Sequence, residues 1–122
     1  MNNPTNTDIS SKAAALDKMV AEGNILEAVE LFFHPKAITQ EGNATDLIEG
    51  KAAKIEHLKT FFAGIGSVNA INLHSTTVGD NVSMSEFTFD LTQKDGTAIL
   101  WNEVLRRNWE DGLVIHERYY TA

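Results

Sequence analysis

Residues 97–121 read TAILWNEVLRRNWEDGLVIHERYYT, two runs of alternating residues separated by the dipeptide Asp111-Gly112. Side chains of a strand alternate between its two faces, so one face of the first run carries Ile99, Trp101, Glu103, Leu105, Arg107 and Trp109. Asp-Gly between alternating runs is among the strongest short-range signals of a β-hairpin. The stretch therefore predicts paired strands over 97–110 and 113–121.

The same period of two extends back to Ser67, where it replaces a helical period. It predicts two further strands, over 68–78 and 82–93. Turn sequences follow each of them, Gly79-Asp80-Asn81 after the first and Lys94-Asp95-Gly96 after the second. Residues 68–121 are therefore expected to form a four-stranded antiparallel meander.

The first half of the chain has helical periodicity. Ser10 or Ser11 can cap a first helix that ends at Gly23, since glycine adopts the left-handed C′ conformation easily. A second helix follows with an apolar side over 25–32, and Pro35 is expected to end it. A third covers 51–62 and turns Ile55, Leu58, Phe61 and Phe62 inward.

The remaining segments complete a single-domain prediction. Residues 1–9 are polar and are expected to form a flexible N-terminal tail, followed by one domain over 10–122. Residues 37–41 predict a short strand, and 42–50 predict a loop. Helices followed by a run of strands are typical of an α+β architecture.

Composition limits the classes of function. Ten basic and seventeen acidic residues give a net charge of −7, and the basic residues are scattered, so we expect no nucleic-acid partner. No run approaches the roughly 20 apolar residues of a membrane span, and the polar start does not resemble a signal peptide. Cysteine is absent, which excludes disulfides and thiolate metal sites and suits a cytoplasmic protein.

The order and spacing of several short segments resemble the SnoaL-like branch of the nuclear-transport-factor-2-like superfamily, over Ser10 to Tyr120. These segments are Gly23-Asn24, Leu31-Phe32, residues 37–41, Glu49-Gly50-Lys51, Glu103-Val104 and residues 109–120. The resemblance implies a cone-shaped α+β barrel in which three N-terminal helices pack on a strongly curved, mainly antiparallel sheet around an open-ended cavity. Members include ketosteroid isomerase, scytalone dehydratase, polyketide cyclases and epoxide hydrolases, and dimers through the sheet are frequent. Fold alone does not give function.

The resemblance suggests Glu41 as a catalytic base. In ketosteroid isomerase the base follows the first strand, and one inserted residue near Pro35 brings Glu41 to that position. Burial at the mouth of an apolar cavity would raise the pKa of a carboxyl group, which suits proton abstraction. The alternative is a solvated glutamate at the start of a polar loop.

Glu103 is the second catalytic candidate. It lies within one residue of the place where ketosteroid isomerase has a protonated aspartate that donates a hydrogen bond. That aspartate is a well-known example of a carboxylic acid kept neutral by its apolar site. Among apolar neighbours Glu103 would be protonated or paired. The alternatives are a salt bridge to Arg107 or a place on the opposite face. Leu16 occupies the position of the isomerase's tyrosine and cannot donate a hydrogen bond, so we do not expect the isomerase reaction itself.

Four histidines raise the question of a metal. They are His34, His57, His74 and His116, and no two have the spacing of helical ligands, so we expect no metal and no cofactor. His57 is expected to face outward. His74, in the middle of a strand, is the histidine expected to look into the cavity, where it would contact substrate.

Trp101, Tyr119 and Phe61 are the other expected substrate contacts, although such aromatic residues more often belong to a core. Two classes of function fit these residues. One is a cofactor-free acid–base enzyme (a cyclase, isomerase, dehydratase or hydrolase) acting on a small, mostly apolar or cyclic ligand. The other is a non-catalytic ligand-binding or dimeric assembly module.

Whether Glu41 and Glu103 reach the same cavity distinguishes these two classes. A homodimer through the sheet is a further expectation. Its basis is an outer sheet face expected to carry Leu100, Val104, Phe87 and Phe89.

Overall fold

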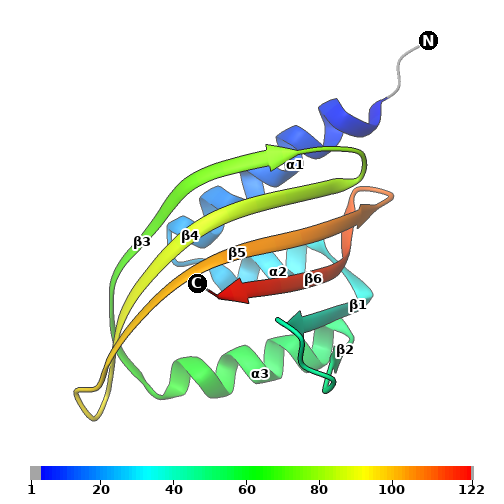
Figure 1. Cartoon of the computed structure of the whole chain (residues 1–122). Coiled ribbons are helices and arrows are strands. Elements are labelled where there is room, and N and C mark those ends of the chain that lie inside the picture. Colours follow the sequence, from blue (N-terminus) through cyan, green and yellow to red (C-terminus); the bar gives the residue numbers. More distant parts are fainter. Residues whose placement is uncertain (1–3, 122) are drawn as a thin grey trace.

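The computed structural model describes residues 4–121 (Figure 1). Within that range the helices are α1 (Pro4–Ala21), α2 (Ile25–Phe32) and α3 (Lys51–Ala63). The strands are β1 (Phe33–Glu41), β2 (Ile48–Glu49), β3 (Ile65–Val78), β4 (Val82–Gln93), β5 (Ala98–Glu110) and β6 (Leu113–Thr121). None of these helices is both long enough and apolar enough to span a membrane.

The helices confirm the predicted periodicity but differ from it at two ends. α1 begins at Pro4, so the part of the expected tail from residue 4 to residue 9 is helical, while residues 1–3 lie outside the described range. Proline is favoured in the first turn, where its missing N–H is not needed. α1 ends at Ala21, and Gly23 two residues later has the left-handed conformation that the prediction assigned to it, with a φ of +86°. α2 ends at Phe32, before Pro35 can act, because the chain is already extended at Phe33.

The sheet has the strand order β2-β1-β6-β5-β4-β3. Strands β3 to β6 form the predicted antiparallel meander, and β1 joins its edge parallel to β6. The short strand β2 lies within the predicted loop and pairs antiparallel with β1. Asp111 and Gly112 both have positive φ, +53° and +79°, as a two-residue type I′ hairpin requires.

The core lies on the concave side of the sheet. Figure 1 shows the strands curving around α1 and α2. α3 lies along the lower edge of the view and leads into the start of β3. Leu16, Val29, Phe33, Leu105 and Val114 are buried between these layers.

The expectation that Phe87 and Phe89 lie on the outer face is wrong. They are opposite Glu103 and Trp101 in the β4–β5 register and are buried in the core. Neighbouring strands share their faces, so the face of β5 that carries Trp101 also fixes that of β4. Met84 lies on the opposite face of β4 and is 44% exposed.

Candidate functional site

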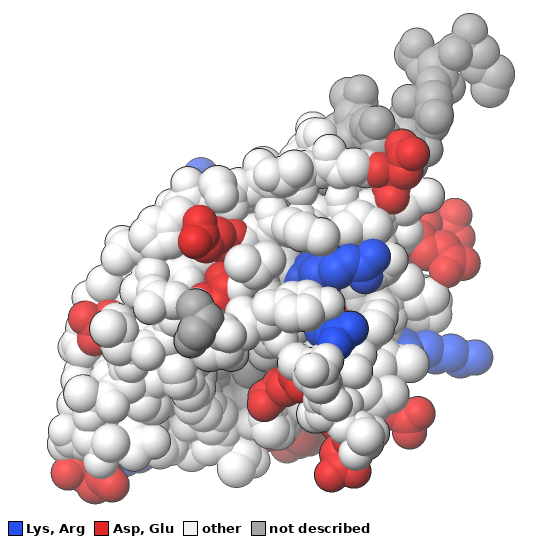
Figure 2. Space-filling model, in the orientation of Figure 1, with Lys and Arg blue, Asp and Glu red and all other residues white. Residues whose placement is uncertain are grey.

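A cavity of about 130 Å³ lies between the concave face of the sheet and the three helices. Most of its wall is apolar, with Leu16, Val20, Val29, Phe33, Leu58, Phe61, Ile71, Phe89, Leu91 and Leu105 among the lining residues. A second hollow of about 230 Å³ is lined by Glu41, Trp101, Glu103, Tyr119 and Thr121. The first four of these line both spaces, so they form the mouth of the cavity. Figure 2 shows the surface hollowed between the end of β6 and α3.

Five of the six residues expected at the site line this cavity. Glu41, at the end of β1, is opposite Tyr119 of β6, and Glu103 projects from the same face of β5 as Trp101. The ring of Phe61 stacks on that of Trp101, with 5.4 Å between centroids and an interplanar angle of 28°. Glu41 and Glu103 therefore reach one cavity, although Glu41 is exposed to solvent as well.

His74 does not belong to this group. It is exposed, and its Nε2 lies 2.7 Å from Oγ1 of Thr88. The register of β3 shifts between Leu73 and Ser75, and this bulge breaks the alternation on which the prediction rested. His57 is the histidine that lines the cavity, from α3, although it is largely exposed.

The surroundings of Glu103 favour its protonated form. Partial burial raises the pKa of Glu103 above its usual range, and the charges of Glu41 and Glu117 add to this effect. The hydroxyl of Thr121, 3.3 Å from Oε2, opposes it by donating a hydrogen bond. The alternative salt bridge from Glu103 to Arg107 is absent, because Arg107 is bonded to two other carboxylates.

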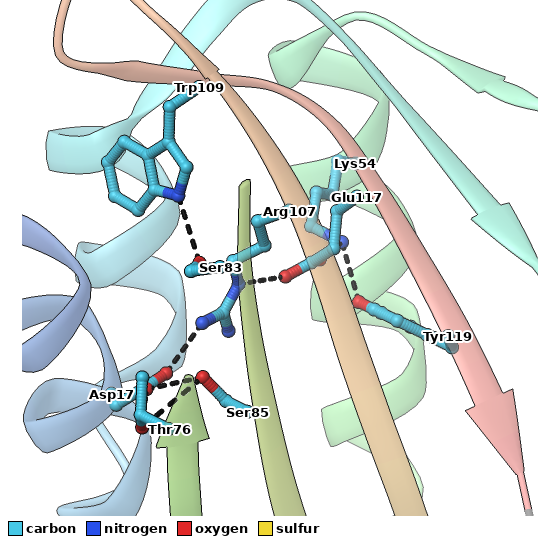
Figure 3. Close-up of polar contacts among 9 residues, drawn as sticks. All are labelled: Asp17, Lys54, Thr76, Ser83, Ser85, Arg107, Trp109, Glu117 and Tyr119. Carbon is cyan, nitrogen blue, oxygen red and sulfur yellow. Dashed lines mark hydrogen bonds and ion pairs between the residues drawn. The ribbon is translucent and has the colours of Figure 1, made fainter. Parts of the chain in front are cut away.

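A buried chain of charges crosses the core beside the cavity (Figure 3). Arg107 donates hydrogen bonds to Asp17, at 2.5 Å, and to Glu117, at 2.7 Å. Lys54 lies 3.0 Å from the other carboxylate oxygen of Glu117 and donates to Oη of Tyr119 at 2.7 Å. The four charged side chains are at most 3% exposed. Two acidic and two basic groups balance, as buried charges require.

Hydroxyl groups of serine and threonine bind the Asp17 carboxylate, at the end of the chain of charges that is farther from Tyr119. Ser85 and Thr76 both donate to the second carboxylate oxygen of Asp17, at 2.5 and 2.7 Å. Next to them the indole N–H of Trp109 donates to Ser83 Oγ at 2.9 Å. The bonds from Ser85 and Thr76 fix the Asp17 carboxylate that accepts from Arg107, as Figure 3 shows.

The pKa values of the groups in this buried chain of charges shift as their mutual pairing requires. Burial alone would raise the pKa of Glu117, but Lys54 and Arg107 outweigh it and lower the pKa to about 2. Burial alone would lower the pKa of Lys54, but Glu117 and Tyr119 outweigh it and raise the pKa above its usual range. Burial and Glu117 raise the pKa of Tyr119, so its phenol is neutral at pH 7. Lys54 therefore donates as an ammonium to a neutral phenol oxygen.

Sequence reasoning missed this buried chain of charges, although the sequence contained part of the pattern that indicates it. Alternation along β5 places Arg107 between Leu105 and Trp109 on the buried face, where a charge requires a partner. Lys54 shares a helical stripe with Leu58 and Phe61 on α3. No local pattern identifies Asp17 as the partner of Arg107, because 90 positions separate them. In the described part of the chain, no cluster of three or more His, Asp or Glu residues could hold a metal.

No family model and no curated protein matches the chain. Among solved structures it is similar to a SnoaL-like, polyketide-cyclase-like protein from Mesorhizobium loti, with 20% identity, 92% of this chain and 97% of that chain covered, and a TM-score of 0.82. A second such protein, from Jannaschia sp. CCS1, has 17% identity, coverages of 99% and 90%, and a TM-score of 0.81. TerC, co-crystallised with polyporic acid, has 14% identity, coverages of 94% and 91%, and a TM-score of 0.75. The chain therefore has the NTF2-like α+β cone fold of the SnoaL-like proteins.

Proposed function

We propose that this protein binds a small, mostly apolar molecule in the cavity and acts on it by acid–base chemistry without a cofactor, as a cyclase, isomerase, dehydratase or hydrolase. The observation that carries the proposal is an apolar cavity whose mouth brings together two carboxyl groups and a phenol. Ligand sites are usually concave, mainly apolar and supplied with a few convergent polar groups. TerC, which shares the fold, was crystallised with a small molecule, polyporic acid.

The three polar groups at the mouth have complementary roles in this proposal. Glu41 is the base, since its exposed carboxylate can take a proton from a ligand and release it to solvent. Glu103, whose pKa is raised by its partial burial, donates a hydrogen bond in its protonated form. Tyr119 accepts from Lys54, and its own O–H can donate either to Glu117 or to an oxygen that gains charge during the reaction.

The Glu41→Gln variant, assayed with a panel of cyclic ketones and epoxides, tests the enzymatic role. We expect turnover to fall by roughly 100-fold or more, because general base catalysis contributes about that much. Stability should change by less than about 0.5 kcal/mol, because Glu41 is exposed. Product formation is followed by mass spectrometry, and unfolding by urea titration.

Glu49→Gln is the matched control, since Glu49 is exposed on β2 and does not line the cavity. Equal turnover in wild type and Glu41→Gln would remove Glu41 from the mechanism. A large loss of stability in Glu41→Gln would mark a structural carboxylate. Tight binding of panel members without turnover of any would favour the alternative, a receptor that only binds its ligand.

We further propose that two copies pair through the convex face of the sheet. With Phe87 and Phe89 in the core, the support for this comes from Leu100, Met84 and Tyr120, which are 65%, 44% and 41% exposed on that face. Figure 2 shows large uncharged areas there, with basic side chains near the middle and acidic side chains beside them. A symmetric partner would cover these apolar groups.

A further inference from the structure

The inner wall of the cavity contains a buried hydroxyl without a partner. Thr39 lies on β1 opposite Glu117, is 2% exposed and lines the cavity. Its Oγ1 has no hydrogen-bond partner among the described residues. Buried polar atoms nearly always have a partner, so an unpaired hydroxyl that lines a cavity indicates that something else bonds to it there.

Lys54 offers a second unused hydrogen-bonding group in the same wall. Its ammonium has three N–H groups, and the hydrogen bonds within the described range go to Glu117 and Tyr119. Nζ also lies near two aromatic rings, with the ring centres of Phe33 and Tyr119 at 5.4 and 5.0 Å. An aromatic face is a weaker partner for a buried ammonium than an oxygen atom.

We infer that Lys54 and Thr39 form a hydrogen-bonding subsite for one uncharged oxygen atom of the ligand, a phenolic or carbonyl oxygen attached to a ring. The inference rests on the proposed binding of a small molecule in the cavity and specifies the chemistry of that molecule. Thr39 can donate to this oxygen or accept from it, and Lys54 donates to it. Glu117, adjacent to Thr39 in the register, keeps the ammonium in place.

Charge balance argues that the oxygen is uncharged. The positive charges of Lys54 and Arg107 are already matched by Asp17 and Glu117, so an anionic ligand would add an uncompensated charge to the core. Glu41 at the mouth would also repel an anion as it entered. A neutral acceptor satisfies the free N–H without disturbing this balance.

Cavity size argues for a single ring in the inner part. The space of about 130 Å³ is close to that of an apolar protein cavity of roughly 150 Å³ that takes up benzene. The stacked rings of Phe61 and Trp101 form one wall and can pack against a flat molecule. A larger ligand would extend through the mouth into the second hollow.

Phenol and toluene are the matched probes, because they have the same ring and phenol carries a hydroxyl group where toluene carries a methyl group. Binding of each to the full chain is measured by chemical-shift titration. An all-apolar cavity prefers toluene, since a buried hydroxyl without a partner is unfavourable. We expect wild type to prefer phenol, and we expect Thr39→Val to shift the ratio of the two affinities toward toluene by about fivefold to tenfold.

Thr39→Val is the decisive variant, because it keeps the side-chain shape and removes a hydroxyl that makes no bond within the described protein. It should therefore be at least as stable as wild type. Lys54→Met should shift the affinity ratio further and lose stability, since it removes a partner of Glu117. Thr77→Val is the control, because Thr77 is exposed on β3 opposite Met84 and does not line the cavity.

The outcomes separate this inference from the proposed function. A ratio that shifts in Thr39→Val and stays constant in Thr77→Val supports the subsite. If both probes bind wild type and the ratio is the same in Thr39→Val, the subsite is wrong while binding in the cavity stands. Failure of both probes to bind wild type would overturn the subsite and the proposed small-molecule function together.

Discussion

At the scale of single residues, Arg107 has the largest expected effect on stability. Arg107→Met would leave Asp17 buried without a positive partner and would leave Glu117 with Lys54 alone. Breaking a buried ion pair from one side typically destabilises a protein by about 3–5 kcal/mol. We expect a loss of that size in urea denaturation. Arg106→Met is the control, since Arg106 lies on the outer face and its bond to Asn108 is only partly buried, so a loss below about 1 kcal/mol is expected.

A loss below about 1 kcal/mol for Arg107→Met would mean that the buried chain of charges contributes little to the fold. It would also mean that the two carboxylates find other partners or take up protons. A pH titration of the variant would then distinguish these two possibilities.

Glu103 makes stability depend on pH in a defined direction. Because its folded pKa is raised, the folded protein holds the proton more tightly than the unfolded chain. The stabilising contribution is complete below the ordinary pKa of 4.5 and is lost as the pH rises through the raised value. Glu103→Gln should therefore melt at a higher temperature than wild type at pH 7, and at nearly the same temperature at pH 4.

The control for this pH effect is Glu86→Gln, the same substitution on the exposed face of β4 and away from the cavity, measured at both pH values. A Glu103→Gln variant that differs from wild type equally at pH 4 and pH 7 would contradict the raised pKa. Glu117 acts in the opposite sense. With its pKa at about 2, its contribution is present above pH 4.5 and is lost as the pH falls toward 2.

At the scale of elements, β3 shows how a bulge redirects side chains. Its pairing with β4 shifts register at three places, between Ile65 and Ser67, between Val68 and Ala70, and between Leu73 and Ser75. The last shift leaves His74 on the outer face beside Thr88. Bulges increase local twist, so the same shifts help the sheet to curve around the helices.

Gly66 lies at the first of these shifts, where β3 passes close to the turn after β4. Replacing it by alanine tests how tightly the two segments pack. A Cβ atom there would lie 3.3 Å from the carbonyl oxygen of Gln93 and 3.3 Å from Cα of Lys94. Both are backbone atoms that cannot move aside easily, so Gly66→Ala should destabilise the protein by about 1–2 kcal/mol. Thermal or urea unfolding measures this loss.

Gly79→Ala, at the other end of β3, is the matched comparison. No heavy atom lies within 4 Å of a Cβ placed there, and the φ of Gly79 is not positive. Alanine restricts the unfolded chain, so this variant should be neutral or more stable by up to about 1 kcal/mol. Equal effects of the two substitutions would mean that close packing at Gly66 does not matter.

At the scale of the whole molecule, pairing through the convex face predicts a dimer in sedimentation at micromolar concentration. Leu100→Asp should shift the protein toward monomer by at least about tenfold in dissociation constant, because it places a charge in the apolar contact. Leu31→Asp is the control, since Leu31 on α2 is similarly exposed, 64% against 65%, but lies away from the sheet. A wild-type monomer at these concentrations would refute the pairing.

The sequence by itself determined the three helices, every strand except β2, and their order. β4 and β6 have the predicted ends at Val82, Gln93, Leu113 and Thr121, and α2 covers the residues 25–32 whose apolar side predicted a helix. These features depend on periodicity and on turn residues such as Asp111-Gly112, which act over a few neighbouring positions. The face of β5 that carries Glu103 and Trp101 was predictable for the same reason.

Only the tertiary structure decided which residues meet. Sheet curvature and strand register bring Asp17 to Arg107 across 90 positions and Lys54 to Tyr119 across 65. They also place Phe87 in the core, turn His74 outward and leave the Thr39 hydroxyl beside a cavity. Such contacts depend on how complete elements pack against one another. A local pattern of residue types carries no information about contacts between residues that are far apart in the sequence.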